Sequence, residues 1–344
     1  KNRPESGMIG RWCILACATV LVTLSACAPT LMTPGPIVGE ARLTDDAFVT
    51  ADGARLPLRK WMPETGQPKV IILALHGFND YSNFFKEPGL FLSQHGIGSY
   101  AYDQRGFGSA PHPRFWSGTA ALVADLKAFA RAVRVHHPGL PLYLLGESMG
   151  AAVIMVAMTE VRQPKTEGVI LAAPAVWGRA TMPWYQRWAL WLGGHTVPWL
   201  TVSGRGLGIK PSDNIEMLIE LGRDPLVIKD TRIDALYGLV NLMDTALERA
   251  TTFHAPALIL YGERDEIIPR EPTAKMLAQL PTVAAGRRQI AIYEGGYHML
   301  LRDLQASTPW RDIAQWIADP GAALLSGADK RPLASFVAKD EGMQ

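Results

Sequence analysis

One stretch of this sequence, residues 142–150, restricts the fold more than any other. A short apolar run ends in Gly-Glu-Ser-Met-Gly at residues 146–150, and an alanine-rich, helix-prone segment at 151–161 follows at once. A strand, a sharp turn and a helix in direct succession form the setting that presents a serine above the edge of a sheet. Glycines at both ends of the turn let the backbone pack closely, so the pattern predicts a nucleophile at Ser148.

Apolar runs and helical patterns alternate over much of the chain. The apolar runs at residues 70–75, 98–102, 142–145, 168–172, 257–261 and 289–293 predict buried strands. Apolar residues three and four positions apart predict an amphipathic helix at 118–135. A further helix is expected at 310–318, at the end of the domain. An Asp-Gly turn at 52–53 predicts a hairpin before the first buried strand. This alternation predicts an α/β fold with a doubly wound, mostly parallel sheet and a site at the carboxyl ends of its strands.

The alternation stops between residues 175 and 253, which predicts a helical cap inserted into the α/β domain. Half of the ten tryptophans lie in this segment, beginning with Trp177. Trp184, Trp188 and Trp191 are spaced as on one face of a helix. They would form either the core of the insertion or an apolar lid over the active site that touches a membrane interface. The sequence leaves both interpretations open.

The composition is typical of a globular enzyme. The chain has 344 residues, of which 48% are hydrophobic and 19% charged, so it can bury a sizeable core. Its formal net charge of +2 and the lack of a basic run with interleaved aromatics give no case for nucleic-acid binding. All three cysteines lie within residues 1–27, so the rest of the sequence has no thiol for a disulfide, a nucleophile or a metal. We expect neither a metal nor a cofactor.

Two further residues complete the requirements of a serine nucleophile. A serine hydroxyl needs a base, and the tautomer of that base must be fixed by an acid. Asp265 and His298 each follow one of the last two predicted strands, so they should meet Ser148 at the same edge of the sheet. The order serine, aspartate, histidine is that of hydrolases built on such a sheet. The sequence therefore predicts a triad, with Glu263 and Asp303 as competitors for the role of the acid.

Backbone N–H groups near the serine are candidates for an oxyanion hole. Met149 opens the helix after the nucleophile, so its N–H should face a developing oxyanion. The second donor should come from the loop after the strand at 70–75, where His-Gly-Phe at 76–78 offers the N–H of Phe78. His76 precedes the serine in the chain and is interpreted as a brace of this loop, not as a base.

Five motifs in order resemble the monoacylglycerol lipase and lysophospholipase group of α/β-hydrolases, which is similar to the serine aminopeptidases of the S33 type. The motifs are His-Gly-Phe at 76–78, Asp-Gln-Arg-Gly-Phe-Gly at 103–108, Gly-Glu-Ser-Met-Gly at 146–150, Gly-Glu-Arg-Asp at 262–265 and Ile-Tyr-Glu-Gly-Gly-Tyr-His at 292–298. The resemblance runs from about residue 70 to 316 and implies cofactor-free hydrolysis of a single-chain lipid ester beneath a mobile cap. Phe78 departs from the pattern, since small residues are common there in close relatives.

Residues 1–27 resemble a bacterial lipoprotein signal. A start with three basic residues and one acidic residue precedes an apolar core at 12–23, which is too short to span a membrane. The core ends in Leu-Ser-Ala-Cys at 24–27. The resemblance implies cleavage before Cys27, acylation of its thiol, and a lipid-anchored protein of the bacterial cell envelope, at the outer membrane or the periplasmic face. An uncleaved anchor and an ordinary signal peptide are the alternatives.

These features predict six segments along the chain. They are the lipoprotein-type signal at 1–27, a tether at 28–46, the first part of an α/β-hydrolase core at 47–174, the cap at 175–253, the second part of the core at 254–320 and a loosely attached tail at 321–344.

The predicted function is that of a serine carboxylester hydrolase. It would cleave monoacylglycerol or lysophospholipid through an acyl-enzyme on Ser148, at a membrane that it contacts through Cys27 and through the cap. A general short-chain esterase and a proline-type serine aminopeptidase are alternatives on the same fold. The peptidase needs acidic residues to bind a substrate ammonium, for which Asp213, Glu216 and Glu220 are available. A non-catalytic lipid-binding or envelope-structural protein is a further alternative, against which an intact triad argues.

Overall fold

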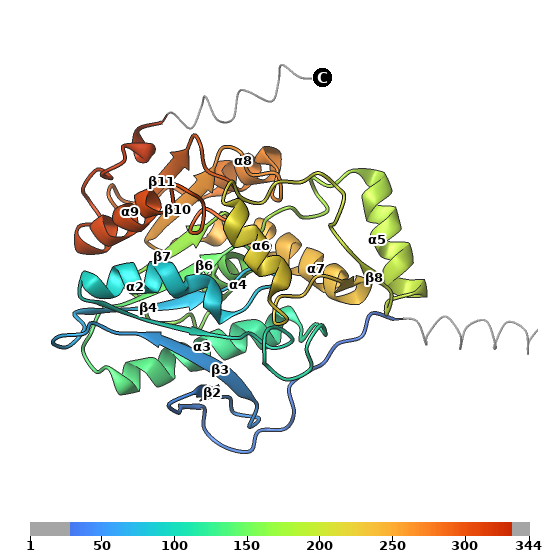
Figure 1. Ribbon diagram of the computed structural model, residues 1–344, viewed down its shortest axis with the longest axis horizontal. Coiled ribbons are helices and arrows are strands. Elements are labelled where there is room, and N and C mark those ends of the chain that lie inside the picture. The colour runs from blue at the N-terminus through green and yellow to red at the C-terminus, as the bar shows by residue number, and fades with distance from the viewer. Residues whose placement is uncertain (1–27, 332–344) are drawn as a thin grey trace, which may run out of the picture.

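A nine-stranded sheet forms the centre of the molecule in a computed structural model that describes residues 28–331 (Figure 1). Its strand order is β1-β2-β3-β5-β4-β6-β7-β10-β11. The strands are β1 (Arg42–Leu43), β2 (Ala47–Val49), β3 (Arg55–Trp61), β4 (Val70–Leu75), β5 (Ile97–Tyr102), β6 (Leu142–Glu147), β7 (Gly168–Ala172), β10 (Ala257–Gly262) and β11 (Arg288–Tyr293). The first four in this order pair antiparallel, and β5 through β11 pair in parallel. The predicted doubly wound, mostly parallel sheet is therefore confirmed.

Helices cover both faces of the sheet. One face carries α2 (Lys86–Gln94) and α9 (Ser307–Ala318), and the other carries α3 (Thr119–His136), α4 (Met149–Ala157), α7 (Ile233–Arg249) and α8 (Arg270–Gln279). The side chains of strand β4 alternate between these two faces. Ile71 and Leu73 belong to the α4 side of the core, and Ile72 and Ala74 belong to the α2 side. All four are buried because both faces of a parallel sheet are covered.

Helix α4 ends earlier than the predicted segment at 151–161. It stops at Ala157, and Thr159 turns its hydroxyl back to the carbonyl oxygen of Val156 at 2.8 Å. Beyond this turn the side chain of Val161 is fully exposed. The predicted segment was too long because hydrophobicity alone does not mark where a helix ends.

The predicted tether at 28–46 lies against the body of the protein. The Met32 N–H donates to the carbonyl oxygen of Trp116 at 2.9 Å, and the Val38 N–H donates to that of Ala51 at 2.8 Å. Strand β1 within it pairs with β2. The predicted signal at 1–27, including Cys27, lies outside the described residues.

The segment predicted as a cap contains five elements besides α7. They are α5 (Trp184–Thr196), β8 (Thr201–Val202), α6 (Ile215–Arg223), β9 (Thr231–Arg232) and the short 3-10 helix η2 (Ala250–Thr252). Strands β8 and β9 pair antiparallel. Figure 1 shows α5 at the right, projecting from the body, and α6 in front of the sheet. Helix α7 falls inside 175–253 but packs on α4, and Leu242 and Ala246 are fully buried there. The limits of the cap stay a prediction.

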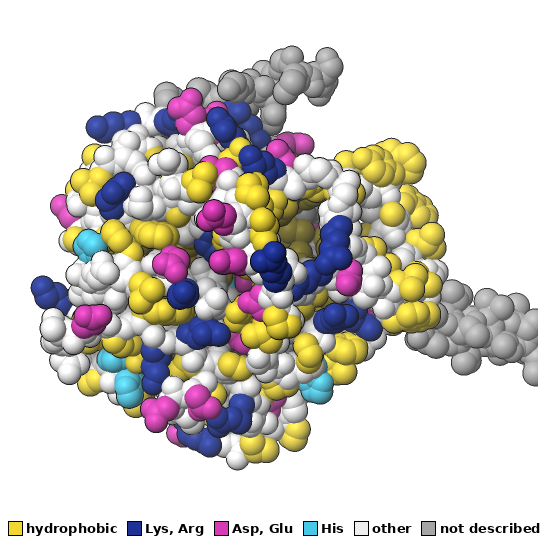
Figure 2. All heavy atoms as spheres, in the orientation of Figure 1, with side chains coloured by type: hydrophobic (Ala, Val, Ile, Leu, Met, Phe, Trp, Pro, Cys, Tyr) yellow, Lys and Arg dark blue, Asp and Glu magenta, His cyan; other side chains and the backbone are white. Residues whose placement is uncertain are grey.

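The tryptophans of α5 do not form a core. Trp184, Trp188 and Trp191 are 68%, 64% and 50% exposed, and Tyr185 beside them is 57% exposed. Figure 2 shows the resulting hydrophobic surface at the right of the molecule, over α5. Of the two interpretations of this helix, that of an internal core is therefore wrong.

The predicted loose attachment of the tail is also wrong as far as residue 331. Leu324 and Ala328 are buried, and the Ser326 hydroxyl donates to Asp312 of α9 at 2.5 Å. Arg331 forms ion pairs with Glu263 and with a glutamate after β11. Apolar anchors within a glycine-rich stretch are enough to hold it against the sheet. Residues 332–344 lie outside the described range.

Candidate active site

The turn between β6 and α4 holds Ser148 in a strained backbone conformation. Its φ is 52° and its ψ is −113°, a region that residues other than glycine rarely adopt. A Cβ atom on Gly146 would lie 2.4 Å from the backbone nitrogen of Ala151, and one on Gly150 would lie 2.3 Å from the carbonyl oxygen of Leu75. No real side chain fits at such distances, so the turn needs both glycines for the mechanical reason that the sequence indicated.

Two loops at the carboxyl ends of β10 and β11 bring Asp265 and His298 together. Nδ1 of His298 lies 2.8 Å from Oδ2 of Asp265. The loops cross at two glycines, where a Cβ on Gly262 would lie 2.5 Å from the carbonyl carbon of Gly296. The Arg264 N–H donates to the Gly296 carbonyl at 2.9 Å and fixes the crossing. The absence of both side chains is what lets the acid reach the imidazole.

The carboxylate of Asp265 is held on both of its oxygens. Oδ1 accepts the backbone N–H groups of Ile267 and Ile268 at 2.8 and 2.9 Å, while Oδ2 faces His298. Because a carboxylate only accepts hydrogen bonds, Nδ1 of the ring carries the proton. Nε2 of the neutral imidazole is then the atom that can accept a proton.

The two competing acids bond elsewhere. Glu263 pairs with Arg331 at 2.9 Å. Asp303 accepts the Ser212 hydroxyl at 2.6 Å and the Tyr297 N–H at 2.7 Å. Of the three candidates for the acid, the fold therefore brings Asp265 to the imidazole.

Burial and nearby charges act on His298 in opposite directions. Burial alone lowers the pKa of its imidazole, because a low-dielectric environment disfavours the charged ring. The charge and hydrogen bond of Asp265, with a smaller contribution from Glu147, outweigh burial and raise the pKa above its ordinary value of 6.5. The positive charge of Arg302 opposes this increase. An imidazolium formed during a reaction would thus be stabilised by two buried carboxylates.

The loop after β4 lies directly against the serine. A Cβ on Gly77 would lie only 3.4 Å from the Cβ atom of Ser148. Phe78, one of the two predicted oxyanion donors, follows Gly77 in the chain. Met149, the other, is the first residue of α4, so its N–H has no acceptor within the helix. Both predicted donors thus adjoin the contact between Gly77 and the nucleophile.

His76 braces this loop, as the sequence predicted. Its Nε2 accepts the backbone N–H of Gln104 at 2.9 Å, and its Nδ1 lies 2.8 Å from the carbonyl oxygen of Gly77. The ring is fully buried, and burial lowers its pKa. Both ring nitrogens are occupied, so this histidine is not available as a general base.

The aromatic residues predicted as lid or substrate contacts fall into two groups. Trp177 is half-buried and packs against the core, while the three tryptophans of α5 face solvent. Phe78 packs against Phe107 and Trp116, with ring centroids 5.5 and 6.2 Å apart. Trp116, which also contacts Gly238 of α7, was not recognised from the sequence. Its place in a glycine- and proline-rich loop gave no periodic signal.

A buried ion-pair cluster beside the triad was also missed. Arg302 bonds to Asp80 at 2.7 Å and to Glu147 at 2.9 Å, and Glu147 immediately precedes Ser148. The one available signal was Glu147 itself, since a charged residue within a buried strand end requires a partner. Its partner lies far away in the sequence and could not be identified.

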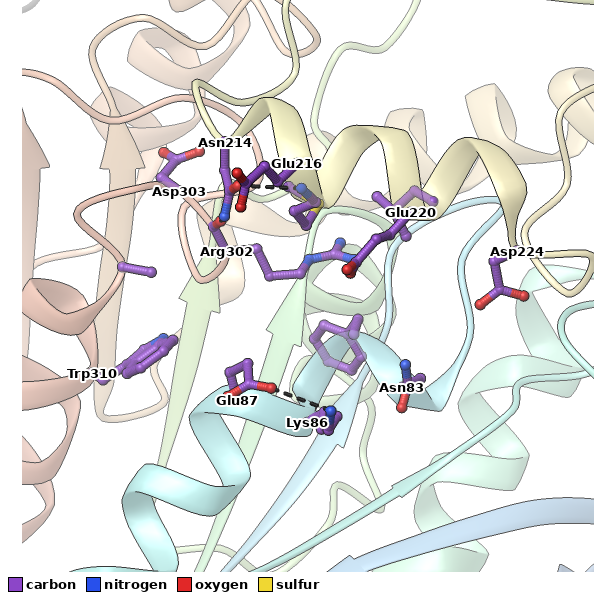
Figure 3. Close-up of a pocket in the computed structure, with 14 residues that line it drawn as sticks. Asn83, Lys86, Glu87, Asn214, Glu216, Glu220, Asp224, Arg302, Asp303 and Trp310 are labelled. Carbon is purple, nitrogen blue, oxygen red and sulfur yellow. Dashed lines mark hydrogen bonds and ion pairs between the residues drawn. The ribbon is translucent and has the colours of Figure 1, made fainter.

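A cavity of about 360 Å³, lined in part by Arg302, lies beneath α6 (Figure 3). Its lining comes from α2, α6, α9 and the residues that flank them: Asn83, Phe84, Lys86, Glu87, Asn214, Glu216, Met217, Glu220, Leu221, Asp224, Arg302, Asp303, Ala306 and Trp310. None of the three triad residues lines it. Figure 3 shows Arg302 extending below α6, the helix that carries Glu216 and Glu220.

A strained serine after a central parallel strand, with a histidine–aspartate pair on later strands of the same sheet, defines a serine hydrolase of the α/β-hydrolase fold. The family model described as "Serine aminopeptidase, S33" matches residues 66–305. The chain belongs to this family.

Relatives of known name support the same grouping. Human monoglyceride lipase is 27% identical over 286 residues, which cover 79% of this chain and 89% of the human protein. The monoacylglycerol lipase of Mycolicibacterium smegmatis is 24% identical over 292 residues, covering 80% of this chain and 96% of that protein. A soluble variant of the Saccharomyces cerevisiae monoglyceride lipase, solved with a substrate analog, superposes with a TM-score of 0.66 at 20% identity. That match covers 86% of this chain and 99% of the yeast chain, and it shows the shared fold.

Proposed function

We propose that the protein hydrolyses monoacylglycerol through an acyl-enzyme on Ser148. The observation that carries the proposal is the pairing of His298 with Asp265 at the sheet edge where the strained serine lies. The similarity to human and mycobacterial enzymes named for this lipid supports the choice of substrate. Lysophospholipid, another single-chain lipid ester, is the second substrate to test.

The mechanism follows from the roles of these groups. Nε2 of His298 takes the proton of the Ser148 hydroxyl as its oxygen attacks the ester carbonyl. The N–H groups of Phe78 and Met149 stabilise the negative charge on the carbonyl oxygen. The imidazolium then gives its proton to the departing glycerol oxygen as the ester C–O bond breaks.

Deacylation repeats the sequence with water. His298 takes a proton from a water molecule, whose oxygen attacks the acyl group on Ser148. The bond to the serine oxygen breaks, that oxygen regains a proton, and the fatty acid leaves. Asp265 stabilises the imidazolium in both halves of the reaction.

The peptidase alternative receives little support from the acidic residues of the cap. Glu216 and Glu220 line the cavity beneath α6, whose lining includes no member of the triad. Asp213 accepts the backbone N–H of Leu304 at 2.9 Å. These contacts give no reason to favour a substrate ammonium over a neutral ester at Ser148.

One assay separates these activities. Purified protein and its Ser148→Ala variant are given monoacylglycerol, lysophospholipid, short-chain esters and aminoacyl amides, and the released products are quantified. We expect the wild type to prefer long-chain monoacylglycerol and the variant, with an unchanged melting temperature, to be inactive. Activity confined to short esters would leave a general esterase, amide cleavage would establish a peptidase, and turnover by the alanine variant would remove Ser148 from the mechanism.

We also propose that the protein works at a membrane of the bacterial cell envelope, anchored by lipid on Cys27. The leader sequence supports the anchor, and the exposed aromatic side chains of α5 support a second contact with the lipid interface. In Figure 1 the described chain begins on the same side of the molecule as α5. No helix between residues 28 and 331 is both long and apolar enough to cross a bilayer. Incorporation of a fatty-acid analogue that is lost in Cys27→Ser would establish the anchor, and its absence from the wild type would refute it.

A further inference from the structure

The cluster of Asp80, Glu147 and Arg302 is an arginine between two buried carboxylates. The side chain of Asp80 is 8% exposed, that of Glu147 2% and that of Arg302 10%. Burial alone would lower the pKa of Arg302, yet the two carboxylates raise it, so the guanidinium stays charged. Burial raises the pKa of Glu147, and the arginine opposes that increase. The arginine therefore favours the charged form of Glu147, while burial and the neighbouring Asp80 disfavour it.

Each member of the cluster sits within a few residues of a different part of the candidate active site. Asp80 lies in the loop that carries Phe78, where its Oδ1 also accepts the Tyr81 N–H at 2.8 Å. Glu147 is the residue before Ser148. Arg302 belongs to the turn that follows His298. One guanidinium group thus ties together the oxyanion loop, the nucleophile turn and the loop of the base.

Stability alone does not account for such a cluster. Removing charges from water costs several kcal/mol per ion, and buried ion pairs often add no net stability over well-packed apolar residues of the same volume. Within the described residues, Oε1 of Glu147 and Nε of Arg302 also lack a hydrogen-bond partner. What the cluster does provide is a fixed distance between three loops that are separate in the sequence.

We propose that Arg302 is a positioning residue for the reaction at Ser148. By pairing with Asp80 and Glu147, it holds the donor of Phe78 and the imidazole of His298 in register with the serine oxygen. The inference rests on the proposed hydrolase function but not on the identity of the lipid. A misplacement of about 1 Å can cost about 100-fold in rate, so a clamp of this kind has a measurable catalytic effect.

The test compares two similar clusters in the same protein. The triple variant Asp80→Asn, Glu147→Gln, Arg302→Met removes every charge of this cluster while keeping the side chains close in size. The matched control is Arg105, which bonds to Asp52 at 2.7 Å and to Asp125 at 2.6 Å with 8–11% exposure. Its control triple is Asp52→Asn, Asp125→Asn, Arg105→Met.

Two readouts are measured for each triple: the melting temperature, and kcat and KM for nitrophenyl butyrate. We expect the Arg302 triple to lose about 10- to 100-fold in kcat with little change in KM, and the control triple to change only in melting temperature. Equal kcat for wild type and the Arg302 triple, or an equal loss in the control triple, would overturn the proposal. Arg302→Lys, which keeps the charge, should recover part of the lost rate.

A pH profile gives a second readout that a merely structural role would not move. Asp265, Glu147 and Arg302 are the charged groups that act on His298. Glu147→Gln should shift the acid limb of kcat/KM to lower pH, and Arg302→Met should shift it to higher pH. If the acid limbs of both single variants coincide with that of the wild type, the proposal is overturned, even if the triple variant does not fold.

The substrate of this test separates the inference from the proposed function. Nitrophenyl butyrate and a fluorophosphonate label report on Ser148 whatever the natural substrate is. If the wild type is labelled and cleaves the activated ester but not monoacylglycerol, the proposed substrate is wrong and the comparison of variants still decides the role of Arg302. If Ser148 is neither labelled nor active, both proposals fall together.

Discussion

Nδ1 of His298 lies 2.8 Å from Oδ2 of Asp265, and the two side chains are 8% and 0% exposed. The aspartate is oriented by backbone N–H groups on its other oxygen, so the pair is preorganised before any substrate binds. This arrangement fixes the tautomer in which Nε2 can act as a base. It also places a negative charge beside the imidazolium that forms during the reaction.

Asp265→Asn should lower kcat by about 10³- to 10⁴-fold, because an amide can hold the ring in the wrong tautomer. The melting temperature should change little, since the amide oxygen of the asparagine can still accept a backbone N–H. Steady-state kinetics on an activated ester measure the loss. Glu263→Gln is the matched control and should retain activity within a few fold. The reverse ranking of the two variants would reassign the acid.

The activity should fall as the solution becomes more acidic. His298 must be neutral to accept a proton, and its pKa is raised by Asp265 and Glu147 despite its burial. The acid limb of kcat/KM should therefore have an apparent pKa above 6.5, the ordinary value for histidine. A pH–rate profile with buffers of constant ionic strength gives this value directly. A limb centred below 6.5 would mean that burial outweighs the carboxylates.

Asp303 should make the folded state less stable as the pH rises. Burial raises its pKa from 3.8 to about 6, although hydrogen bonds from Ser212 and Tyr297 oppose the shift. The folded protein binds this proton more tightly than the unfolded chain, so the stability from the group is full below about pH 4 and is lost as the pH rises through about 6. Relative to Asp303→Asn, the wild type should lose roughly 2–3 kcal/mol between pH 4 and 7.

Urea unfolding of both proteins at several pH values measures this difference. The substitution also removes one acceptor for Ser212 or Tyr297, so it has a cost that does not depend on pH. The quantity to examine is therefore how the difference in unfolding free energy between the wild type and Asp303→Asn changes with pH. A difference that stays constant from pH 4 to 7 would show that Asp303 titrates normally.

Gly150→Ala should destabilise the protein by at least about 2–3 kcal/mol, because its Cβ would lie 2.3 Å from the carbonyl oxygen of Leu75. Gly222, within α6, is the control. A Cβ there would meet nothing within 4 Å, so Gly222→Ala should stabilise the helix by about 0.5–1 kcal/mol. Chemical denaturation reports both values. Tolerance of alanine at position 150 would contradict the packing of the nucleophile turn against β4.

Replacing Trp184, Trp188 and Trp191 together by serine should reduce binding to anionic lipid vesicles by at least about ten-fold. The background is Cys27→Ser, which isolates the contribution of α5 from that of a lipid anchor. Hydrolysis of a soluble ester should be unchanged. Val161→Ser is the control, since this fully exposed residue lies beyond the far end of α4 from the active site. Equal binding by all variants would remove α5 from the membrane contact.

Local signals predicted most of the sheet. Continuous apolar runs identified β4, β5, β6, β7, β10 and β11 within one or two residues, because strands buried on both faces have no polar side to obscure them. The sequence also predicted that Asp265 and His298 lie close together, because each follows a parallel strand and the carboxyl ends of such strands share one edge of the sheet. Helix α7 was harder: it directly follows the two-residue strand β9, within the segment where the strand–helix alternation stops. Its sequence does not tell whether its apolar face covers the cap or α4.

The sequence by itself determined the nucleophile turn, because what that turn requires is local: a serine at positive φ and glycines where backbone atoms meet. Only the tertiary structure decided what surrounds it. Arg302 and Glu147 are 155 positions apart, and they meet because the order of the strands brings their loops together. The α5 tryptophans have a helical spacing whether they face a core or solvent, and only packing makes the choice. Backbone requirements lie within neighbouring residues, whereas contacts between distant residues depend on how the whole chain packs.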